Sequence, residues 1–174
     1  MHDNGLPLWR RAVIALGSNQ GDSVVILQRA LMSLASLSGA KPVSVSSFYT
    51  SAPAYYDEQD FFVNAVCIME IEQTPLDFLY EIQEIENQFH RVRSFKNAPR
   101  TLDLDLIDIG GVVSDDPILI LPHPLACERD FVVTPLWEID SLFVFANGVE
   151  LSSCRPSVGA VGAIVKSREE LVFS

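Results

Sequence analysis

The sequence is poor in basic residues. Its 174 residues contain 12 Lys and Arg against 23 Asp and Glu, which gives a formal net charge of −11 with histidine neutral. Proteins that bind nucleic acid need a strong positive field to neutralise phosphates. General nucleic-acid binding is therefore excluded, and any polyanionic ligand must meet a local cluster of cations that works against the net charge.

Cysteines and long apolar runs are also scarce. The three cysteines, Cys67, Cys127 and Cys154, are scattered and form no CxxC pair. Such a set predicts reduced thiols in a cytosolic protein, and neither a disulfide framework nor a zinc site. The apolar run Ala12–Leu16 is too short for a signal peptide, and no run approaches the length of a membrane span. We therefore expect a cytoplasmic protein that has no membrane partner.

Enough apolar material is nevertheless present for a real core. Hydrophobic residues make up 48% of the chain and charged residues 20%, which are ordinary values for a globular domain. No linker, internal repeat or low-complexity tract divides the sequence. We expect a single domain over residues 1–174, with a core at about 11–140 and a C-terminal extension at 141–174.

Apolar periodicity divides the core into four strands and two helices. Asp22 or Ser23 is a candidate N-cap for the first helix, and Thr74-Pro75 opens the second. Each helix carries an apolar stripe at spacings of three and four residues, formed by Val24, Leu27, Leu31 and Leu34 in the first and by Phe78, Ile82, Ile85 and Phe89 in the second. The predicted strands are 11–16, 43–49, 61–71 and 102–109.

The resulting order, βαββαβ, predicts an α+β fold, a ferredoxin-like sandwich. Both helices would cover one face of the sheet, and the other face would stay open for a site. Extra C-terminal elements would follow, among them a hairpin at Asn147-Gly148.

Two aspartates give the sharpest chemical signal. Asp103 and Asp105 are two residues apart on a predicted strand, so their carboxylates share one face while Leu102, Leu104 and Leu106 take the other. Adjacent acids repel one another unless a cation joins them, and Mg²⁺ accepts one or two carboxylates when phosphates supply its other ligands. The alternative is a solvated strand end of alternating polarity.

Cations precede these acids within about a dozen residues, at Arg91, Arg93, Lys96 and Arg100. Arginine forks suit bidentate contacts to phosphate oxygens. Cations beside paired acids indicate a nucleotide-phosphate site in which the acids hold metal and the metal and arginines hold phosphates. The sequence has no P-loop and no GxGxxG motif, and its GSNQG stretch is equally well explained as a tight strand-to-helix turn.

Aromatic and amide side chains on the even-numbered face of the third predicted strand suggest a site for a flat ring. Phe62 lies there and, with Phe131, is a candidate clamp. Asn64 on the same face is a candidate reader of a ring edge. His123, held between two prolines and followed by Arg129, is a candidate phosphate ligand. The alternative for the two phenylalanines is simple core packing.

The sequence as a whole resembles a known family. The segments ALGSN, SSFYTSAP, FFVNAV, RVR, KNAPRTLDLDLI and LPHP, followed by Arg129 and Phe131, are similar in order and content to 6-hydroxymethyl-7,8-dihydropterin pyrophosphokinases of folate biosynthesis. The resemblance runs from about Ala12 to Ile139. It implies a ferredoxin-like enzyme that transfers pyrophosphate from ATP to the hydroxymethyl oxygen of the pterin and releases AMP.

The same resemblance implies a role for each matching residue. Asp103 and Asp105 would hold two Mg²⁺ ions bridged by the ATP phosphates. Contacts to ATP would come from Gln83, Glu86, Arg91, Arg93, Arg100, Leu106, His123 and Arg129, with the three arginines before the acids also taking part in catalysis. Contacts to the pterin would come from Ser51, Ala52, Pro53, Ala54, Phe62, Asn64 and Phe131. A monomer is expected, with ATP and the pterin as its partners.

The sequence departs from the family pattern at its substrate loops. Lys96-Asn97-Ala98 stands where the family commonly has Arg-Trp-Gly, so a ring that helps to cover the pterin is missing. Two other readings of the residues stay open. One is a metal-dependent phosphohydrolase or nuclease built on the paired acids, and the other is a non-catalytic ferredoxin-like binding module.

Overall fold

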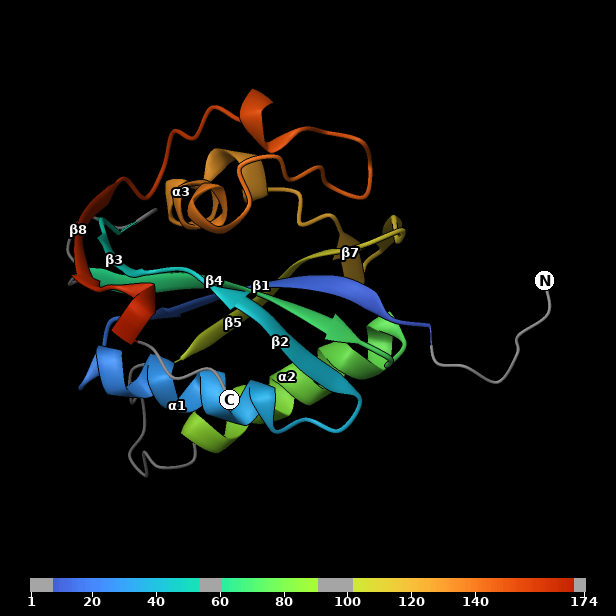
Figure 1. Cartoon of the computed structure of the whole chain (residues 1–174), viewed down its shortest axis with the longest axis horizontal. Coiled ribbons are helices and arrows are strands. Elements are labelled where there is room, and N and C mark those ends of the chain that lie inside the picture. Colours follow the sequence, from blue (N-terminus) through green and yellow to red (C-terminus); the bar gives the residue numbers. More distant parts are fainter. Residues whose placement is uncertain (1–7, 54–60, 91–101, 171–174) are drawn as a thin grey trace.

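The computed structural model describes residues 8–53, 61–90 and 102–170 (Figure 1). The strands are β1 (Arg10–Ser18), β2 (Ala40–Val45), β3 (Phe48–Ser51), β4 (Phe62–Ile71), β5 (Asp103–Ile109), β6 (Ser114–Asp116), β7 (Leu119–Leu121) and β8 (Val161–Lys166). The α-helices are α1 (Ser23–Ala35), α2 (Pro75–His90) and α3 (Asp130–Ile139). Short 3-10 turns lie at Ala126–Glu128, Leu151–Ser153 and Arg168–Glu170.

The main sheet is antiparallel, with strand order β5-β1-β4-β3-β8, and β2 also pairs with β4. The mixed α/β architecture with an antiparallel sheet, predicted from the sequence, is confirmed. β1 lies between β4, with which it pairs over its whole length, and the edge strand β5. β6 and β7 form a separate two-stranded ribbon.

The single strand predicted over 43–49 is wrong, because β2 and β3 are separate strands that follow each other along the same edge of β4. Ser46 interrupts the ladder between them. Its N–H donates to the carbonyl of Val66 at 2.9 Å, and its hydroxyl accepts from the N–H of Val66 at 2.9 Å. A side-chain oxygen thus replaces a backbone carbonyl, which lets the chain bend without leaving a buried polar group unpaired.

The lower face of the sheet is covered by α1 and α2, as predicted (Figure 1). Asp22 caps α1, since its side chain accepts a hydrogen bond from the N–H of Val25 at 3.3 Å. The predicted apolar stripes face the core. Their buried residues are Leu27, Leu31 and Leu34 of α1 and Phe78, Ile82 and Ile85 of α2. They pack on the apolar lower faces of β1, β4 and β5, which include Ile14, Met69 and Leu104.

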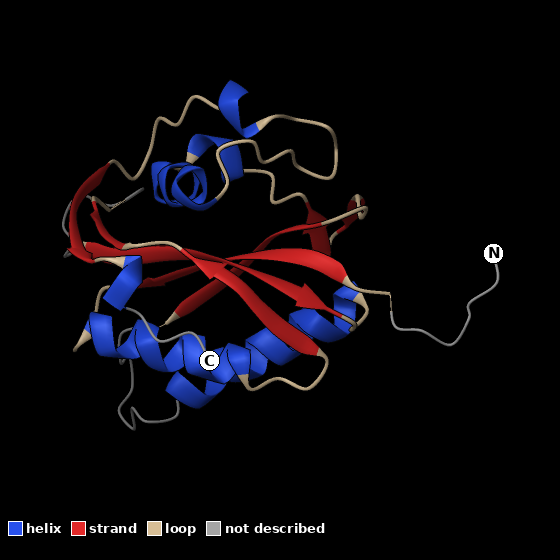
Figure 2. Cartoon of the chain, viewed as in Figure 1, coloured by secondary structure: helices blue, strands red, loops and turns tan. Residues whose placement is uncertain are grey.

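The upper face is not left open, which corrects the expectation that helices cover one face only. Figure 2 shows α3 and the chain that follows it on the side of the sheet opposite to α1 and α2. A second core forms there between Val13, Val66 and Ile68 of the sheet and Val132, Leu136 and Phe143 of the covering layer. The apolar residues at even-numbered positions of β4 explain this cover, because they would otherwise face water.

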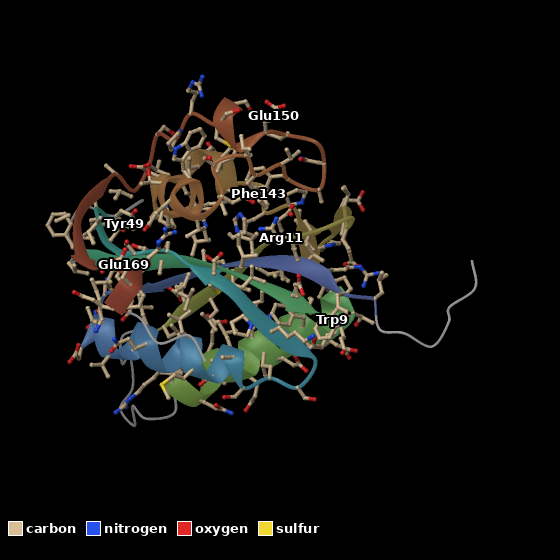
Figure 3. All side chains as sticks on the ribbon, viewed as in Figure 1. Trp9, Arg11, Tyr49, Phe143, Glu150 and Glu169 are labelled. Carbon is tan, nitrogen blue, oxygen red and sulfur yellow. A yellow bond between two sulfur atoms is a disulfide. The ribbon has the colours of Figure 1, made fainter. Side chains whose placement is uncertain are left out.

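Three polar contacts fix α3 to the sheet. The carboxylate of Glu138 accepts hydrogen bonds from the N–H of Ser47 at 2.8 Å, from the Ser47 hydroxyl at 2.7 Å and from the Tyr49 hydroxyl at 2.7 Å. Burial, with the neighbouring Glu138, raises the pKa of Tyr49. At the other end of the sheet, Arg11 forms an ion pair of 3.2 Å with Asp140, and Figure 3 shows Arg11 and Tyr49 beneath this upper layer.

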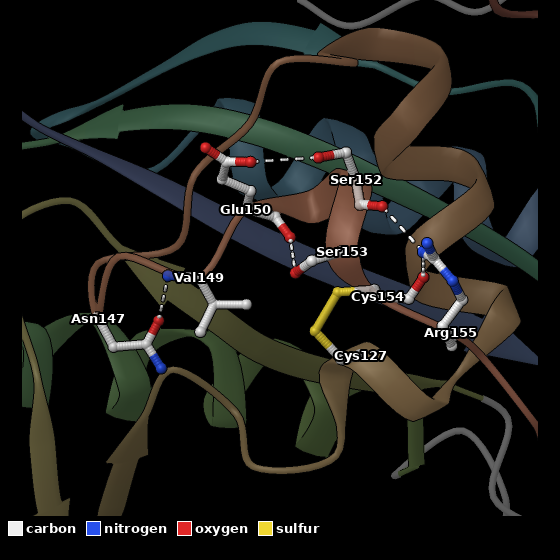
Figure 4. The surroundings of a disulfide bond; sticks show 8 residues. All are labelled: Cys127, Asn147, Val149, Glu150, Ser152, Ser153, Cys154 and Arg155. Carbon is white, nitrogen blue, oxygen red and sulfur yellow. Dashed lines mark hydrogen bonds between the residues drawn. A yellow bond between two sulfur atoms is a disulfide. The ribbon is translucent and has the colours of Figure 1, made fainter.

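A disulfide joins Cys127 to Cys154 (Figure 4), so the prediction that all three thiols are reduced is wrong for this pair. The two cysteines are 27 residues apart in sequence, and only the return of the chain over α3 brings them together. Cys67 is free and fully buried in the lower core, as its position on the odd-numbered face predicted, and burial raises the pKa of its thiol.

The C-terminal extension is part of the sheet. β8 pairs antiparallel with β3 and forms the edge beside it. The predicted turn at Asn147-Gly148 is confirmed, with an antiparallel bridge between Val144 and Glu150 around it. Across the stretches of chain that the structure describes, no helix has the length and apolar character needed to cross a membrane.

Asp108 makes the folded state sensitive to pH. It is 3% exposed, and its Oδ1 accepts from the N–H of Ala146 at 2.9 Å. Burial raises the pKa of Asp108 to about 6, although the hydrogen bond from Ala146 acts in the opposite direction. The folded state therefore holds this proton more tightly than the unfolded chain does, and ionisation destabilises it.

We expect the free energy of unfolding to lose a contribution of up to about 3 kcal/mol as the pH rises from about 4 to about 6, and to lose no more above that. Asp108→Asn keeps an oxygen that accepts from Ala146 and removes the titration. Urea unfolding of both proteins at several pH values checks this, since every other group is shared and cancels. An unchanged difference between the two proteins across this window would contradict the assignment.

Candidate functional site

The paired aspartates lie on the upper face of the sheet, at the start of edge strand β5. In the pairing of β1 with β5, Asp103 is opposite Gly17 and Asp105 is opposite Ala15. Leu102, Leu104 and Leu106 are buried in the lower core. The predicted alternation of Asp103 and Asp105 with these leucines is therefore confirmed.

The Arg129 side chain reaches Asp105 from the layer above. The guanidinium of Arg129 lies 3.8 Å from the Asp105 carboxylate, and the Arg129 side chain is only 13% exposed while that of Asp105 is 46% exposed. Because the Arg129 side chain is largely buried, water and salt screen its charge only weakly. An anion that approaches the exposed side of Asp105 would therefore be attracted by the Arg129 charge.

His123 belongs to the same cluster. Burial, with Arg129, lowers the pKa of His123, and the charge of Asp105 offsets part of that effect. The N–H of Leu125 donates to His123 Nδ1 at 3.2 Å. The neutral ring therefore carries its proton on Nε2 and can donate one hydrogen bond from that atom.

Asn64 extends the site along the sheet toward β3. Asn64 on β4 is opposite Gly17 on β1, and Gly17 is opposite Asp103, so the three form one row across the upper face. Asn64 is 5% exposed, and its side-chain oxygen accepts a hydrogen bond from the Ser51 hydroxyl. Phe62 is opposite Ser51 on the same face and is half-buried.

Gly17 is a site residue whose purpose the sequence did not reveal. A Cβ at this position would lie 2.8 Å from Nδ2 of Asn64 and 3.8 Å from the Phe62 ring. Because glycine has no side chain, the Asn64 amide can occupy this space. The GSNQG stretch marks the glycine in the sequence, but only the pairing of β1 with β4 shows that it faces Asn64.

Phe131 completes the cluster from the first turn of α3. The Arg129 guanidinium lies 5.6 Å from the centre of the Phe131 ring, a cation–π distance. Phe131 is half-buried and packs against the upper core. The structure thus places Arg129 and Phe131, which were predicted separately as an ATP contact and a pterin contact, beside each other.

The other predicted residues lie away from this face or outside the described part. Glu86 on α2 accepts a hydrogen bond from the N–H of Leu104, between the two aspartates, at 3.1 Å, and Gln83 is exposed on the same helix. The side chain of Leu106 is buried in the lower core. Ala52 and Pro53 are partly exposed after β3. Four predicted residues lie outside the described residues, namely Ala54, Arg91, Arg93 and Arg100.

The chain is similar to known proteins over most of its length. A family model described as 7,8-dihydro-6-hydroxymethylpterin-pyrophosphokinase (HPPK) matches residues 13–141. The 2-amino-4-hydroxy-6-hydroxymethyldihydropteridine pyrophosphokinase of Haemophilus influenzae is 43% identical over 136 residues, which cover 78% of this chain and 85% of that protein. The chain belongs to the HPPK family. The resemblance stated from its motifs is confirmed.

Longer members of the HPPK family also match. The folic acid synthesis protein FOL1 of Dictyostelium discoideum is 41% identical over 132 residues, but the matched part is 75% of this chain and only 20% of that protein. A crystal structure of Plasmodium falciparum HPPK-DHPS superposes with a TM-score of 0.67 at 14% identity, over 86% of this chain and 45% of that one. The latter likeness shows the fold alone.

The hydrogen bond from Leu104 to Glu86 generates a prediction about the start of β5. Glu86→Ala leaves an edge N–H between the two aspartates without its acceptor, so we expect a loss of about 1 kcal/mol in the free energy of unfolding and weaker binding of ATP with Mg²⁺. Glu86→Gln keeps an oxygen acceptor and should retain most of both. Urea unfolding and calorimetric titration measure the two effects, and an equal loss in both variants would show that the negative charge matters rather than the hydrogen bond.

Proposed function

We propose that this chain transfers the β,γ-pyrophosphate of ATP to the hydroxymethyl oxygen of 6-hydroxymethyl-7,8-dihydropterin, in folate biosynthesis. The main support for the proposal is that Asn64, Gly17 and Asp103 form one row on the upper face of the sheet, where Asp105 also pairs with Arg129. An amide that could hydrogen-bond the edge of a ring therefore lies beside a cluster of charges that could bind phosphate. A bond forms between the hydroxymethyl oxygen and the β-phosphorus while the hydroxyl proton passes to water. The bond from that phosphorus to the bridging oxygen of the α-phosphate breaks, and AMP leaves with that oxygen and the bonding electron pair.

Asp103 and Asp105 fit a magnesium site. Both are hard oxygen donors on one face of one strand, and Asp105 is half-exposed. No group of three or more histidine, cysteine or carboxylate side chains that could hold a metal by itself occurs among the described residues. A pair of carboxylates suits Mg²⁺ whose remaining ligands are phosphate oxygens and water, and we propose two such ions. Bound there, Mg²⁺ would supply positive charge that offsets the charge of the triphosphate.

The protein's own cations act on the same phosphates. The Arg129 guanidinium is held beside the Asp105 carboxylate, so it lies next to the proposed metal ligands before the nucleotide arrives. His123 donates from Nε2. Arg91, Arg93 and Arg100 are proposed to add further contacts, and Gln83, Glu86 and the backbone of Leu106 to line the nucleotide. Catalysis would then depend on positioning and charge, because the proposed transfer passes directly from ATP to the pterin.

The pterin end of the site is set by Asn64 and two rings. The hydroxyl of Ser51 donates to Asn64 Oδ1, which fixes the orientation of the amide. Phe62 from the sheet and Phe131 from α3 are proposed to cover the two faces of the pterin. Backbone groups of Ser51, Ala52, Pro53 and Ala54 are proposed to complete the pocket.

The strand order supports a finer description of the fold. With β2 and β3 counted as one interrupted strand, the order β5-β1-β4-β3 and the two helices below it correspond to a ferredoxin-like core. We propose that core for residues 11–140, in a single domain with its extension. We also propose a monomer in the cytoplasm, where ATP is available.

Incubation of the chain with ATP, Mg²⁺ and 6-hydroxymethyl-7,8-dihydropterin tests the proposed reaction. AMP and the pterin diphosphate should form in equal amounts. ADP or free phosphate would instead favour a phosphohydrolase, and absence of turnover would favour a binding module.

The aspartates should be separable from folding. We expect Asp103→Asn and Asp105→Asn each to keep the fold, since both side chains are partly exposed on a strand end, and to lower kcat on the order of a hundredfold or more. AMP production at saturating Mg²⁺ is the measurement, with a thermal unfolding curve as the control. Near-normal turnover in either variant would remove that residue from the metal site.

The two rings should act on the pterin alone. Phe62→Ala and Phe131→Ala each remove a stacking surface worth roughly 0.5–1.5 kcal/mol beyond area burial. We expect a weaker affinity for the pterin and an unchanged affinity for ATP. Calorimetric titration with each ligand checks this, and equal losses for both ligands would assign the rings to general packing.

A further inference from the structure

Four consecutive residues of the C-terminal extension, Val158–Val161, connect the two sides of the proposed pterin pocket. On one side, Ala160 accepts from the N–H of Ala52 at 3.0 Å, and Val161 is opposite Ser51 in the pairing of β8 with β3. On the other side, Val158 accepts from the N–H of Asp130 at 2.9 Å. These residues lie beyond residue 141, where the match to the HPPK family model ends.

The start of α3 is fixed to this segment by side-chain contacts as well. Asp130 Oδ2 accepts from the N–H of Val161 at 2.8 Å, and Asp130 Oδ1 accepts from the Thr134 hydroxyl at 2.6 Å. Val158 also forms a parallel bridge with Arg129. Val158 and Val161, on either side of Gly159 and Ala160, are therefore held against the start of α3, whose N-cap residue Arg129 forms the ion pair with Asp105.

Gly159 lies in the middle of this segment and touches the Phe131 ring. A Cβ at Gly159 would be 2.3 Å from Cδ1 and 2.6 Å from Cε1 of Phe131, closer than any real contact. Gly159 is buried and has a φ of +65°, a backbone conformation that favours glycine. The ring thus occupies the space that any other residue would fill.

We propose that Gly159 is a positioning residue for the pterin. By leaving this space it sets how far the Phe131 ring withdraws from the sheet, and so the gap between Phe131 and Phe62 that receives the flat substrate. The same segment fixes Ser51 and Ala52 on the opposite side of the pocket. The role rests on the proposed function, because it adds Gly159 to the Phe62 and Phe131 ring clamp of that site.

Gly159→Ala tests the proposal. Because the added methyl must displace the ring, we expect the dissociation constant for 6-hydroxymethyl-7,8-dihydropterin to rise on the order of tenfold. The titration uses saturating Mg²⁺ and α,β-methylene ATP, whose carbon bridge cannot break. The affinity for this nucleotide should stay within about twofold, and KM for the pterin should rise more than kcat falls. Unchanged pterin binding would overturn the proposal.

Gly148→Ala is the matched control. Gly148 has a φ of +89° in the same C-terminal extension, but nothing lies within 4 Å of the added Cβ. It therefore imposes the same kind of backbone strain without touching a ring. A loss of pterin affinity in Gly148→Ala equal to that in Gly159→Ala would assign the effect to strain and overturn the proposal.

A double-mutant cycle with Phe131→Ala decides whether Gly159 acts through the ring. Once the ring is gone, Gly159→Ala should cost no further pterin affinity, whereas a full additional loss would overturn the proposal. If Gly159→Ala alone fails to fold, the double variant that also lacks the ring must fold, with a melting temperature close to that of Phe131→Ala. A double variant that stays unfolded would also overturn it.

The two proposals fail in different ways. A wild-type chain that binds neither ligand and makes no AMP would contradict the proposed function itself. Wild-type turnover together with unaltered pterin binding in Gly159→Ala would contradict only the role of Gly159.

Discussion

The antiparallel pairing of β1 with β4 on one side and β5 on the other determines where the polar groups that the sheet contributes to the site lie. Opposite residues in such pairs share a face, so Asn64, Gly17 and Asp103 form one row and Asp105 follows beside Ala15. A shift of one residue in either pairing would turn the amide or the carboxylates into the apolar core below. The lower core, with Ile14, Met69 and Leu104 packed beneath α1 and α2, therefore protects the register on which the site depends.

The upper layer supplies what the sheet lacks. The sheet's upper face presents an amide and carboxylates, whereas the proposed phosphate cations and the second ring come from residues 123–131 above it. This layer is fixed at the end of α3 by Glu138, which holds Ser47 and Tyr49, and at its start by Asp130, which holds Val161. In a chain with a net charge of −11, the proposed triphosphate would be met at this point by Arg129, which is largely buried and close to the proposed metal ligands.

Much of this arrangement was predictable because it follows local periodicity. The alternation of acids and leucines over Leu102–Leu106, the cap at Asp22 and the stripe of α2 are short-range patterns, and each is confirmed. The break between β2 and β3 was not predictable from the sequence. It depends on the hydrogen bond that the Ser46 hydroxyl accepts from the N–H of Val66, and this bond forms only when β4 lies beside it. The disulfide was missed for a similar reason, since Cys127 and Cys154 belong to no spacing motif.

The sequence by itself determined the chemistry of the residues, the two core helices below the sheet and the family to which the chain belongs, because residue type and short-range periodicity can be read directly from the order of the amino acids. Only the tertiary structure decided which of those residues meet. Arg129 reaches Asp105, Gly17 makes room for Asn64 and Gly159 makes room for Phe131 through contacts between segments far apart in sequence. Such contacts depend on strand register and on how the upper layer packs, and they leave no local pattern behind.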